Sequence, residues 1–189
     1  MQHEILDFWF GPSGESPYGK SRDEWFRKDP AFDRLIAARF GEPLAAAIAG
    51  GFETWSGSPR GSLALVILLD QFTRNVHRDT PQAFSGDQRA LAVARTSVDR
   101  GDDDALIPVE RWFLYMPFVH AENEDAQQRS LELFMRLRDE SGLAEPLLWA
   151  EKHAAVIRRF GRYPHRNAML GRSSTPEEAA FLLEPGSRF

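Results

Sequence analysis

Residues 63–75 read Leu63-Ala64-Leu65-Val66-Ile67-Leu68-Leu69-Asp70-Gln71-Phe72-Thr73-Arg74-Asn75 and carry the strongest structural signal in the chain. The first seven residues are all apolar, so a helix built from them has no polar face, which is typical of a helix buried in the middle of a protein. Ser58-Pro59 supplies an N-cap and a proline for the first turn of that helix. We therefore predict one central helix whose last turns change abruptly from apolar to polar residues.

Helical signals recur on both sides of this central helix, whereas the alternation of β-branched residues expected of strands is almost missing. A second helix without a polar face is predicted at 108–120, with a kink or an end at Pro117. The other predicted helices are 30–40 closed by Gly41, 42–49, 87–98 capped by Asp87, 125–138, 146–160 closed by Gly161, and 179–183 after the capping box Thr175-Pro176-Glu177-Glu178. Helices joined by such short connections predict an all-α protein of stacked antiparallel helical hairpins.

Length and composition limit the class of protein that this chain can be. With 189 residues, 42% of them apolar, and no long linker, we predict a single domain over residues 1–189. The absence of cysteine excludes disulfides, thiolate metal sites and cysteine nucleophiles. The chain starts without a secretory signal and its longest apolar run is too short to cross a bilayer, so we expect a cytoplasmic protein with no membrane contact. A net charge of −5 argues against nucleic acid as a partner.

The polar end of the central helix holds the first group of candidate site residues. Asp70 and Arg74 are four residues apart, as are Gln71 and Asn75, so each pair can meet on one side of a helix. Because the preceding turns are apolar, at least one pair is expected to point into the protein, where an unpaired charge would be very costly. We interpret Asp70 as a candidate acid or base and the other three as ligand contacts. The alternative is a structural network that joins buried helices.

A second group lies in Arg158-Arg159-Phe160-Gly161-Arg162-Tyr163-Pro164-His165-Arg166-Asn167. A helix that restarts at Pro164 would leave the N–H groups of the next three residues free to bind an anion. Arg162 and Arg166 could then hold a carboxylate or phosphate, with Asn167 beside them, while His165 handles a proton. The alternative is that Arg166 and Asn167 cap neighbouring helices and His165 is an interior residue.

His120-Ala121-Glu122 ends the second apolar helix and forms a third group. Such a pair can act as a base and the acid that orients it, with Gln127 one turn into the next helix as a ligand contact. A histidine at a helix C-terminus also interacts favourably with the helix dipole, which is the simpler explanation of His120. Without cysteine, a zinc site would need His and carboxylate ligands such as His120, Glu122, His153 and His165, and their spacing matches no metal motif. We therefore expect no metal or other cofactor.

Four segments of the chain together resemble the bacterial "domain of unknown function 924" family. They are Ile5-Leu6-Asp7-Phe8-Trp9-Phe10-Gly11, residues 68–75, Phe113-Leu114-Tyr115-Met116-Pro117-Phe118-Val119-His120-Ala121-Glu122, and residues 160–167. The resemblance spans nearly the whole chain and implies an all-helical fold similar to the right-handed superhelices of tetratricopeptide-like proteins. It implies no established activity, so no catalytic role is carried over from it.

Two functions are consistent with these residues. The first is a site for an anionic small molecule in a polar pocket between helices, with hydrolysis as its candidate reaction. Its predicted catalytic residues are Asp70, His120, Glu122 and His165, and its predicted ligand contacts are Gln71, Arg74, Asn75, Gln127, His153, Arg162, Arg166 and Asn167. The second is a noncatalytic module of the tetratricopeptide type that binds a protein or peptide. A third interpretation is that the polar clusters only fix helix packing.

Overall fold

The computed structural model describes residues 1–187; positions 188 and 189, the last two of the predicted domain, lie outside the described residues. Over the described range the regular elements are all helical, which confirms the predicted all-α class. The helices are α1 (Gln2–Phe10), α2 (Pro30–Ile48), α3 (Pro59–Val66), α4 (Thr73–Val76), α5 (Asp87–Asp99), α6 (Pro108–His120), α7 (Glu124–Ser141), α8 (Glu145–Phe160) and α9 (Pro176–Phe181). Short 3-10 turns occupy Asp23–Trp25, Glu53–Gly57, Pro81–Phe84, Asp102–Ala105 and Pro164–Arg166.

The predicted central helix is present, but its middle is not an ordinary α-helix. Between α3 and α4 the residues Ile67–Phe72 form a π-helical segment, in which each turn is one residue wider than in an α-helix. The Ser58 side chain caps α3 by accepting from the N–H of Gly61, as the sequence predicts. Residues 61–73 are buried without interruption, so the π-helical segment lies in the interior. Single π turns inside α-helices occur frequently at functional sites.

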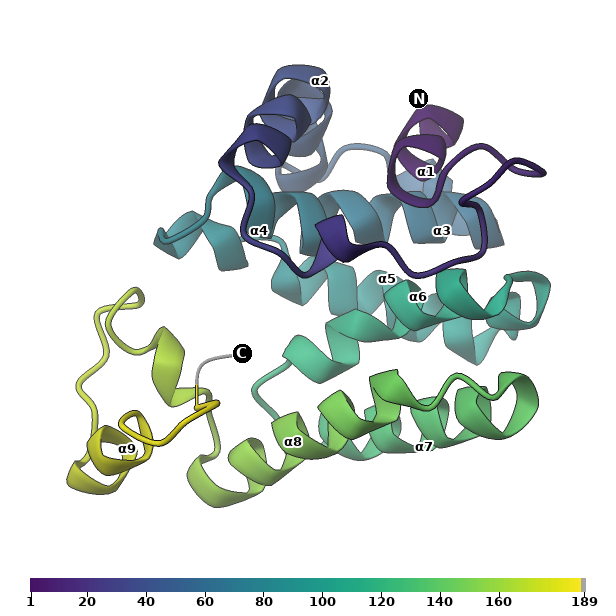
Figure 1. Ribbon diagram of the computed structural model, residues 1–189. Coiled ribbons are helices and arrows are strands. Elements are labelled where there is room, and N and C mark those ends of the chain that lie inside the picture. The colour runs from purple at the N-terminus through teal and green to yellow at the C-terminus, as the bar shows by residue number, and fades with distance from the viewer. Residues whose placement is uncertain (188–189) are drawn as a thin grey trace.

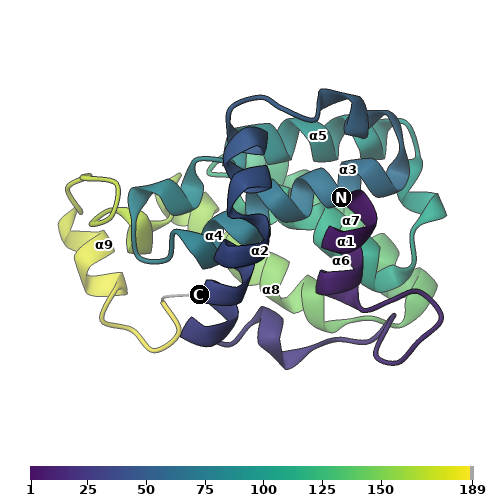
Figure 2. The same cartoon turned by 90° about the horizontal axis from the view of Figure 1, so that it is seen from above.

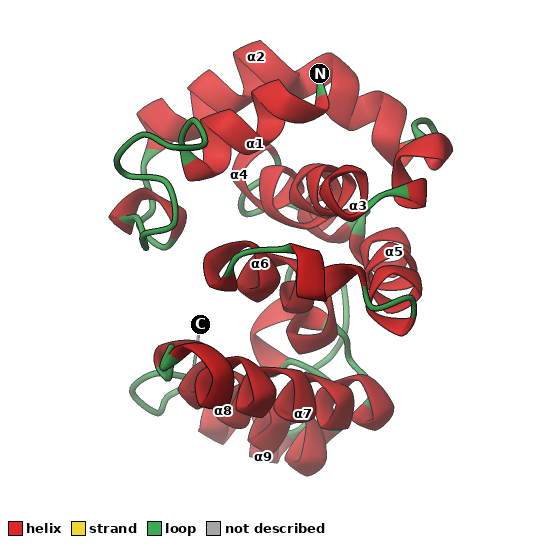
Figure 3. Cartoon of the chain, turned by 90° about the vertical axis from the view of Figure 1, so that its right-hand side faces the viewer, coloured by secondary structure: helices red, strands yellow, loops and turns green. Residues whose placement is uncertain are grey.

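The helices stack in layers around this central helix (Figures 1 and 3). Figure 3 shows α1 and α2 on one side of α3 and α5 and α6 on the other, with α7 and α8 beyond α6. The α7–α8 pair lies side by side and is joined by residues 142–144, so the two helices run antiparallel. One continuous apolar core extends from Ile5 in α1 to Ala150 in α8. This arrangement agrees with the predicted stack of hairpins, while the handedness of a superhelix stays a prediction.

The predicted helix end at Gly41 is wrong because burial overrides a local helix breaker. α2 does not stop at Gly41 but continues as one helix to Ile48, through Pro43. Its buried stripe of Ile36, Phe40, Leu44 and Ala47 runs across the glycine, so tertiary packing holds the helix together. The helix predicted over 108–120 is present as α6, and it does not end at Pro117 but continues to His120.

The C-terminal segment, residues 161–187, forms a small unit at the end of α8 (Figures 1 and 2). It lies at the same end of the molecule as α4 in both views. Gly161 ends α8 in the left-handed conformation, and α9 begins with the predicted capping box between Thr175 and Glu178. A minor apolar cluster of Val156, Ile157 and Tyr163 holds this unit to α8. In residues 1–187 no helix combines the length and apolarity needed to cross a membrane.

Candidate functional site

A cavity of about 550 Å³ lies between the polar end of the central helix, α6 and α8. The polar and charged side chains of its wall are Gln71, Arg74, Asn75, Arg78, Asp79, His120, Glu145, His153, His165 and Arg166. The rest is largely apolar and includes Trp25, Phe26, Phe84, Trp112, Met116 and Trp149. The structure therefore brings the central helix and the 158–167 segment, far apart in the sequence, to one shared hollow. A volume of this size is in the range of small-molecule sites.

Asp70 lies directly behind the cavity and positions His120. The carboxylate is completely buried, and its Oδ1 is 2.7 Å from Nδ1 of His120. Because an ionised carboxylate only accepts hydrogen bonds, Nδ1 carries the proton and Nε2 is left with its lone pair. Burial alone would raise the pKa of Asp70, but the charge of Arg74, the neighbouring imidazole of His120 and the hydrogen bonds from His120 and Gln71 together lower it. The sequence had paired His120 with Glu122; the acid that orients it is Asp70.

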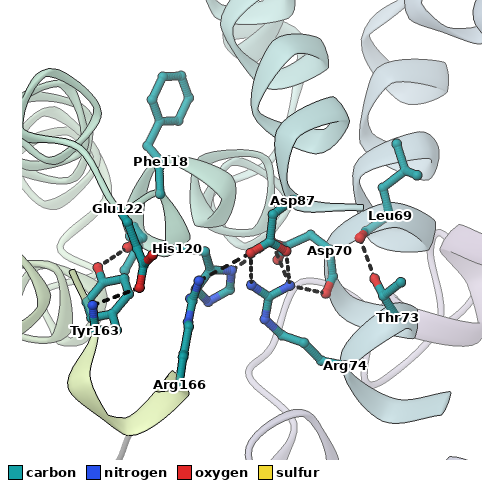
Figure 4. A network of polar contacts seen from close by, with 12 residues as sticks. Leu69, Asp70, Thr73, Arg74, Asp87, Phe118, His120, Glu122, Tyr163 and Arg166 are labelled. Atoms are coloured by element: carbon teal, nitrogen blue, oxygen red, sulfur yellow. Dashed lines mark hydrogen bonds and ion pairs between the residues drawn. The ribbon is translucent and has the colours of Figure 1, made fainter. Parts of the chain in front are cut away.

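Arg74 and Arg166 share one carboxylate, that of Asp87 at the start of α5 (Figure 4). The guanidinium of Arg74 lies 2.9 Å from Oδ1 of Asp87 and 3.1 Å from Oδ1 of Asp70, so it bridges both acids. Arg166 approaches the other oxygen of Asp87 only to 3.4 Å. We call Asp70, Arg74, Asp87, His120 and Arg166 the cavity cluster.

Arg166 is the least satisfied member of the cavity cluster. Its side chain is 7% exposed and its guanidinium lies 4.7 Å from the ring centres of both Phe84 and Tyr163, which sandwich it. Among the described residues the only hydrogen bond of its side chain is the long one to Asp87, and its Nε is buried without a partner. Burial and the nearby charge of Arg74 lower the pKa of Arg166. Arg166 thus retains donors that the protein does not use.

A close backbone approach brings Asp87 to the two arginines. Gly86, the residue before α5, packs on the π-helical segment so tightly that a Cβ would lie 2.1 Å from the carbonyl oxygen of Leu69. Only glycine allows this contact. The Thr73 hydroxyl donates to the same Leu69 carbonyl (Figure 4). The sequence predicts Asp87 as a helix cap; the structure has Gly86 in that position, and Asp87 instead forms ion pairs with the arginines.

Two further histidines border the cavity and are held in the neutral form. Burial lowers the pKa of His153 to about 3, and nearby groups, among them Arg166, lower it further. The hydrogen bond to the Trp149 carbonyl opposes this shift without reversing it. Burial, followed by the charge of Arg166, lowers the pKa of His165 to about 4. Burial and Arg74 also lower the pKa of His120, against the effect of Asp70. At neutral pH all three imidazoles can accept a proton.

Three predicted site residues lie in a different polar cluster, away from the cavity wall. Glu122 forms a two-point ion pair with Arg172 at 2.6 and 2.9 Å, and Arg162 does the same with Glu178 at 2.6 and 2.8 Å. Asn167 joins the two pairs by donating to Glu178 and accepting from Arg172. We call these five residues the C-terminal cluster. The guanidinium of Arg162 is therefore paired with Glu178, whereas that of Arg166 lies at the cavity wall.

The other predicted ligand contacts are divided between the cavity and structural roles. Gln71 donates to Asp70 at 2.6 Å and Asn75 donates to Asp33 at 2.7 Å, so the expected Gln71–Asn75 pair is replaced by two other pairs. Both side chains still line the cavity. Gln127, in the first turns of α7, has a structural role. Its side-chain amide donates to the carbonyls of Phe118, Val119 and Ala121 at the C-terminal end of α6.

The predicted helix start at Pro164 is wrong. Pro164–Arg166 is a single 3-10 turn, and the N–H groups of Arg166 and Asn167 donate to the carbonyls of Tyr163 and Pro164. These two N–H groups are therefore not free to bind an anion, as the prediction required. Over residues 1–187 no group of three or more His, Asp or Glu side chains is arranged to hold a metal ion.

Several residues at the site carry no clear signal in the sequence. Asp87 has only the pattern of a helix cap, and nothing around Phe84 marks it as part of the cavity wall. Trp112 and Met116 were assigned to a helix that is apolar all round, and nothing in that pattern distinguishes cavity wall from core. The one local signal was Gly86 directly before Asp87, since a glycine in front of a helix can mark a close approach of two backbones.

Comparison with known proteins identifies the family but no activity. A family described as "Bacterial protein of unknown function (DUF924)" matches residues 5–186. Among solved structures, the chain is similar to ATU0120, a protein of unknown function from Agrobacterium tumefaciens, with 39% sequence identity and a TM-score of 0.84 over 96% of each chain. No curated protein matches the chain. The resemblance drawn from the four sequence segments is thus confirmed, and the chain belongs to the bacterial DUF924 family.

Proposed function

We propose that this protein binds a small organic anion in the cavity, through the guanidinium groups of Arg74 and Arg166. The observation that carries the proposal is the state of Arg166, which is buried at the cavity wall with one long ion pair and unused donors. Burying such a group without acceptors is unfavourable, and an anion in the cavity would supply them. A surface module for proteins or peptides, the alternative from the sequence, would not need arginines buried in this way.

The Asp70–His120 pair supports a proton-transfer step on the bound anion. Asp70 fixes the imidazole with Nε2 unprotonated, as a general base requires. Where the anion carries an ester or amide bond, His120 takes a proton from water and the water oxygen bonds to the carbonyl carbon. The bond to the leaving alcohol or amine then breaks, and the imidazolium returns its proton to that group. Hydrolysis of a carboxylate-bearing ester is therefore the reaction class that we propose.

Binding can be tested by the NMR signals of the five histidines during a titration with butyrate. We expect saturable shifts for the three cavity histidines and none for His3 and His77, which are not part of the cavity wall. Arg166→Gln should weaken binding about ten-fold or more, because charge-assisted hydrogen bonds contribute about 1.5–3 kcal/mol. Arg162→Gln is the matched control, since Arg162 is held by Glu178. The proposal would be overturned if no cavity histidine signal shifted, or if both variants lost the same amount of butyrate affinity.

The reaction can be tested with a mono-p-nitrophenyl ester of a dicarboxylic acid, which has one carboxylate and one ester bond. Release of p-nitrophenolate should be lost in His120→Gln, while butyrate still binds within a few-fold of its normal affinity. Asp70→Asn should also lose activity, because the imidazole is then no longer held with Nδ1 protonated. Unchanged hydrolysis in His120→Gln would exclude this role for His120 and leave the binding proposal standing.

A further inference from the structure

The apolar wall of the cavity carries information about the ligand beyond its charge. Arg74 and Arg166 occupy one part of the wall, whereas Trp25, Trp112, Met116 and other large apolar side chains form most of the remainder. A cavity of about 550 Å³ is much larger than a formate or acetate ion requires. An anion bound only at the arginines would leave apolar surface in contact with water.

Part of this apolar wall is exposed to solvent at the surface. Phe26 is 56% exposed and stacks on Trp112 with ring centres 5.2 Å apart, and Trp149 in α8 is 43% exposed. Large apolar side chains gathered at a hollow, rather than scattered singly, mark a binding surface. Glu145 also lines the cavity and is exposed, so an occupant with a second negative charge at that end would be repelled.

We infer that the ligand is an amphipathic carboxylate, with one carboxylate group and an unbranched alkyl or aromatic body. This inference rests on the proposed function, since it uses the same arginines for the charged group. The carboxylates of Asp70 and Asp87 lie within the cavity cluster and disfavour a doubly charged group such as a phosphate monoester. A single carboxylate at the arginines allows its apolar body to lie against Trp112, Met116 and Trp149.

The direct test is a titration of the full chain with butyrate, hexanoate and octanoate, each kept below its micelle concentration. Three of the five tryptophans line the cavity, so their fluorescence reports binding. Burial of one methylene contributes about 0.8 kcal/mol, which is about a four-fold gain in affinity for each methylene added. We expect affinity to rise steadily with chain length and octan-1-ol to bind at least ten-fold more weakly than octanoate. In Arg166→Gln this preference for octanoate should largely disappear.

A neighbouring pair of exposed residues gives a matched control. Trp149→Ala should weaken octanoate binding several-fold and leave butyrate binding within two-fold. Leu148→Ala should change neither, because Leu148 is 57% exposed and is not part of the cavity wall. Both residues are exposed enough for the variants to fold, and circular dichroism checks that they do.

Each other outcome overturns a defined part of the argument. If butyrate binds but longer chains bind no better, the amphipathic ligand is wrong and the anion site stands. If octan-1-ol binds as well as octanoate, the arginines do not recognise the charged group and the inference fails. If no carboxylate binds, the proposed function fails with it. A stable dimer in light scattering that is dissociated by Trp149→Ala would show that a second copy of the chain covers the apolar wall, and would also overturn the inference.

Discussion

The cavity cluster and the C-terminal cluster each contain two arginines and two carboxylates but differ in how completely these charges are paired. In the C-terminal cluster each arginine has its own carboxylate and contacts both of its oxygens at 2.9 Å or less. In the cavity cluster two arginines share Asp87, and one of them approaches it only to 3.4 Å. Two-point pairs with separate partners are typical of structural ion pairs.

The difference shows which polar clusters are candidates for function in an uncharacterised protein. The C-terminal cluster joins residues 161–187 to the end of α6. Its arginines are already paired with carboxylates at two points each, so a ligand would have to compete with these pairs. The cavity cluster borders a hollow and has unused donors on Arg166, so an anionic ligand could accept hydrogen bonds from them. Their charged residues alone could not separate the two clusters, since each has two arginines and two carboxylates.

The largest expected effect is the loss of Arg74 from the cavity cluster. Arg74→Ala leaves the completely buried Asp70 with His120 and Gln71 as its side-chain partners within residues 1–187. Breaking a buried ion pair in this way costs about 3–5 kcal/mol of unfolding free energy. Urea denaturation measures it, and Arg74→Ala combined with Asp70→Asn should recover part of the loss. A loss below 1 kcal/mol would mean that Arg74 does not stabilise Asp70.

A smaller effect is expected from acid, again at the cavity. The pKa of His153 is about 3 in the folded protein and about 6.5 when unfolded, so the unfolded chain takes up the proton first as the pH falls. The stabilisation is complete above pH 6.5 and decreases toward pH 3. Between pH 7 and 4.5, His153→Gln should therefore lose about 2.5 kcal/mol less unfolding free energy than the original chain. If the unfolding free energy depended on pH in the same way in both proteins, His153 would not be held neutral by the fold. The control is His3→Gln, which replaces an exposed histidine.

The smallest effect is expected in the C-terminal cluster. Arg172→Met removes the two-point pair with Glu122, but both side chains are about a quarter exposed, so water can replace part of the interaction. We expect a loss of about 1 kcal/mol in unfolding free energy and butyrate affinity within two-fold. Thermal unfolding and the NMR titration measure the two quantities. A large loss of affinity would place this cluster in the binding site and remove the contrast between the two clusters.

The sequence predicted the fold well where the signals were local. The apolar run 63–69, the capping box at Thr175 and the glycine after α8 each act within a few residues, and the structure has all three as expected. The end of α2 was mispredicted because the buried stripe that overrides Gly41 is a property of packing. The π-helical segment has no simple sequence pattern and was not predicted.

The candidate site was predicted in part for a similar reason. Arg74, His120 and Arg166 could be selected as polar residues beside apolar helices, and the structure brings them to one cavity. Their partners could not be selected, because pairing depends on contacts distant in sequence: His120 lies 50 residues from Asp70, and Arg166 lies 79 residues from Asp87. Sequence neighbours such as Glu122 and Arg162 were chosen instead, and they form ion pairs elsewhere.

The wide turn at Ile67–Phe72 sets the angular position of everything that follows it. Each residue of a regular helix rotates the chain by about 100°, so one residue more in a turn swings Arg74 and Asn75 by roughly that angle around the axis. If the same sequence formed an uninterrupted α-helix, Arg74 would no longer point toward Asp87, nor Asn75 toward Asp33. The chemistry at the end of this helix is thus governed by its winding as much as by which residues it contains.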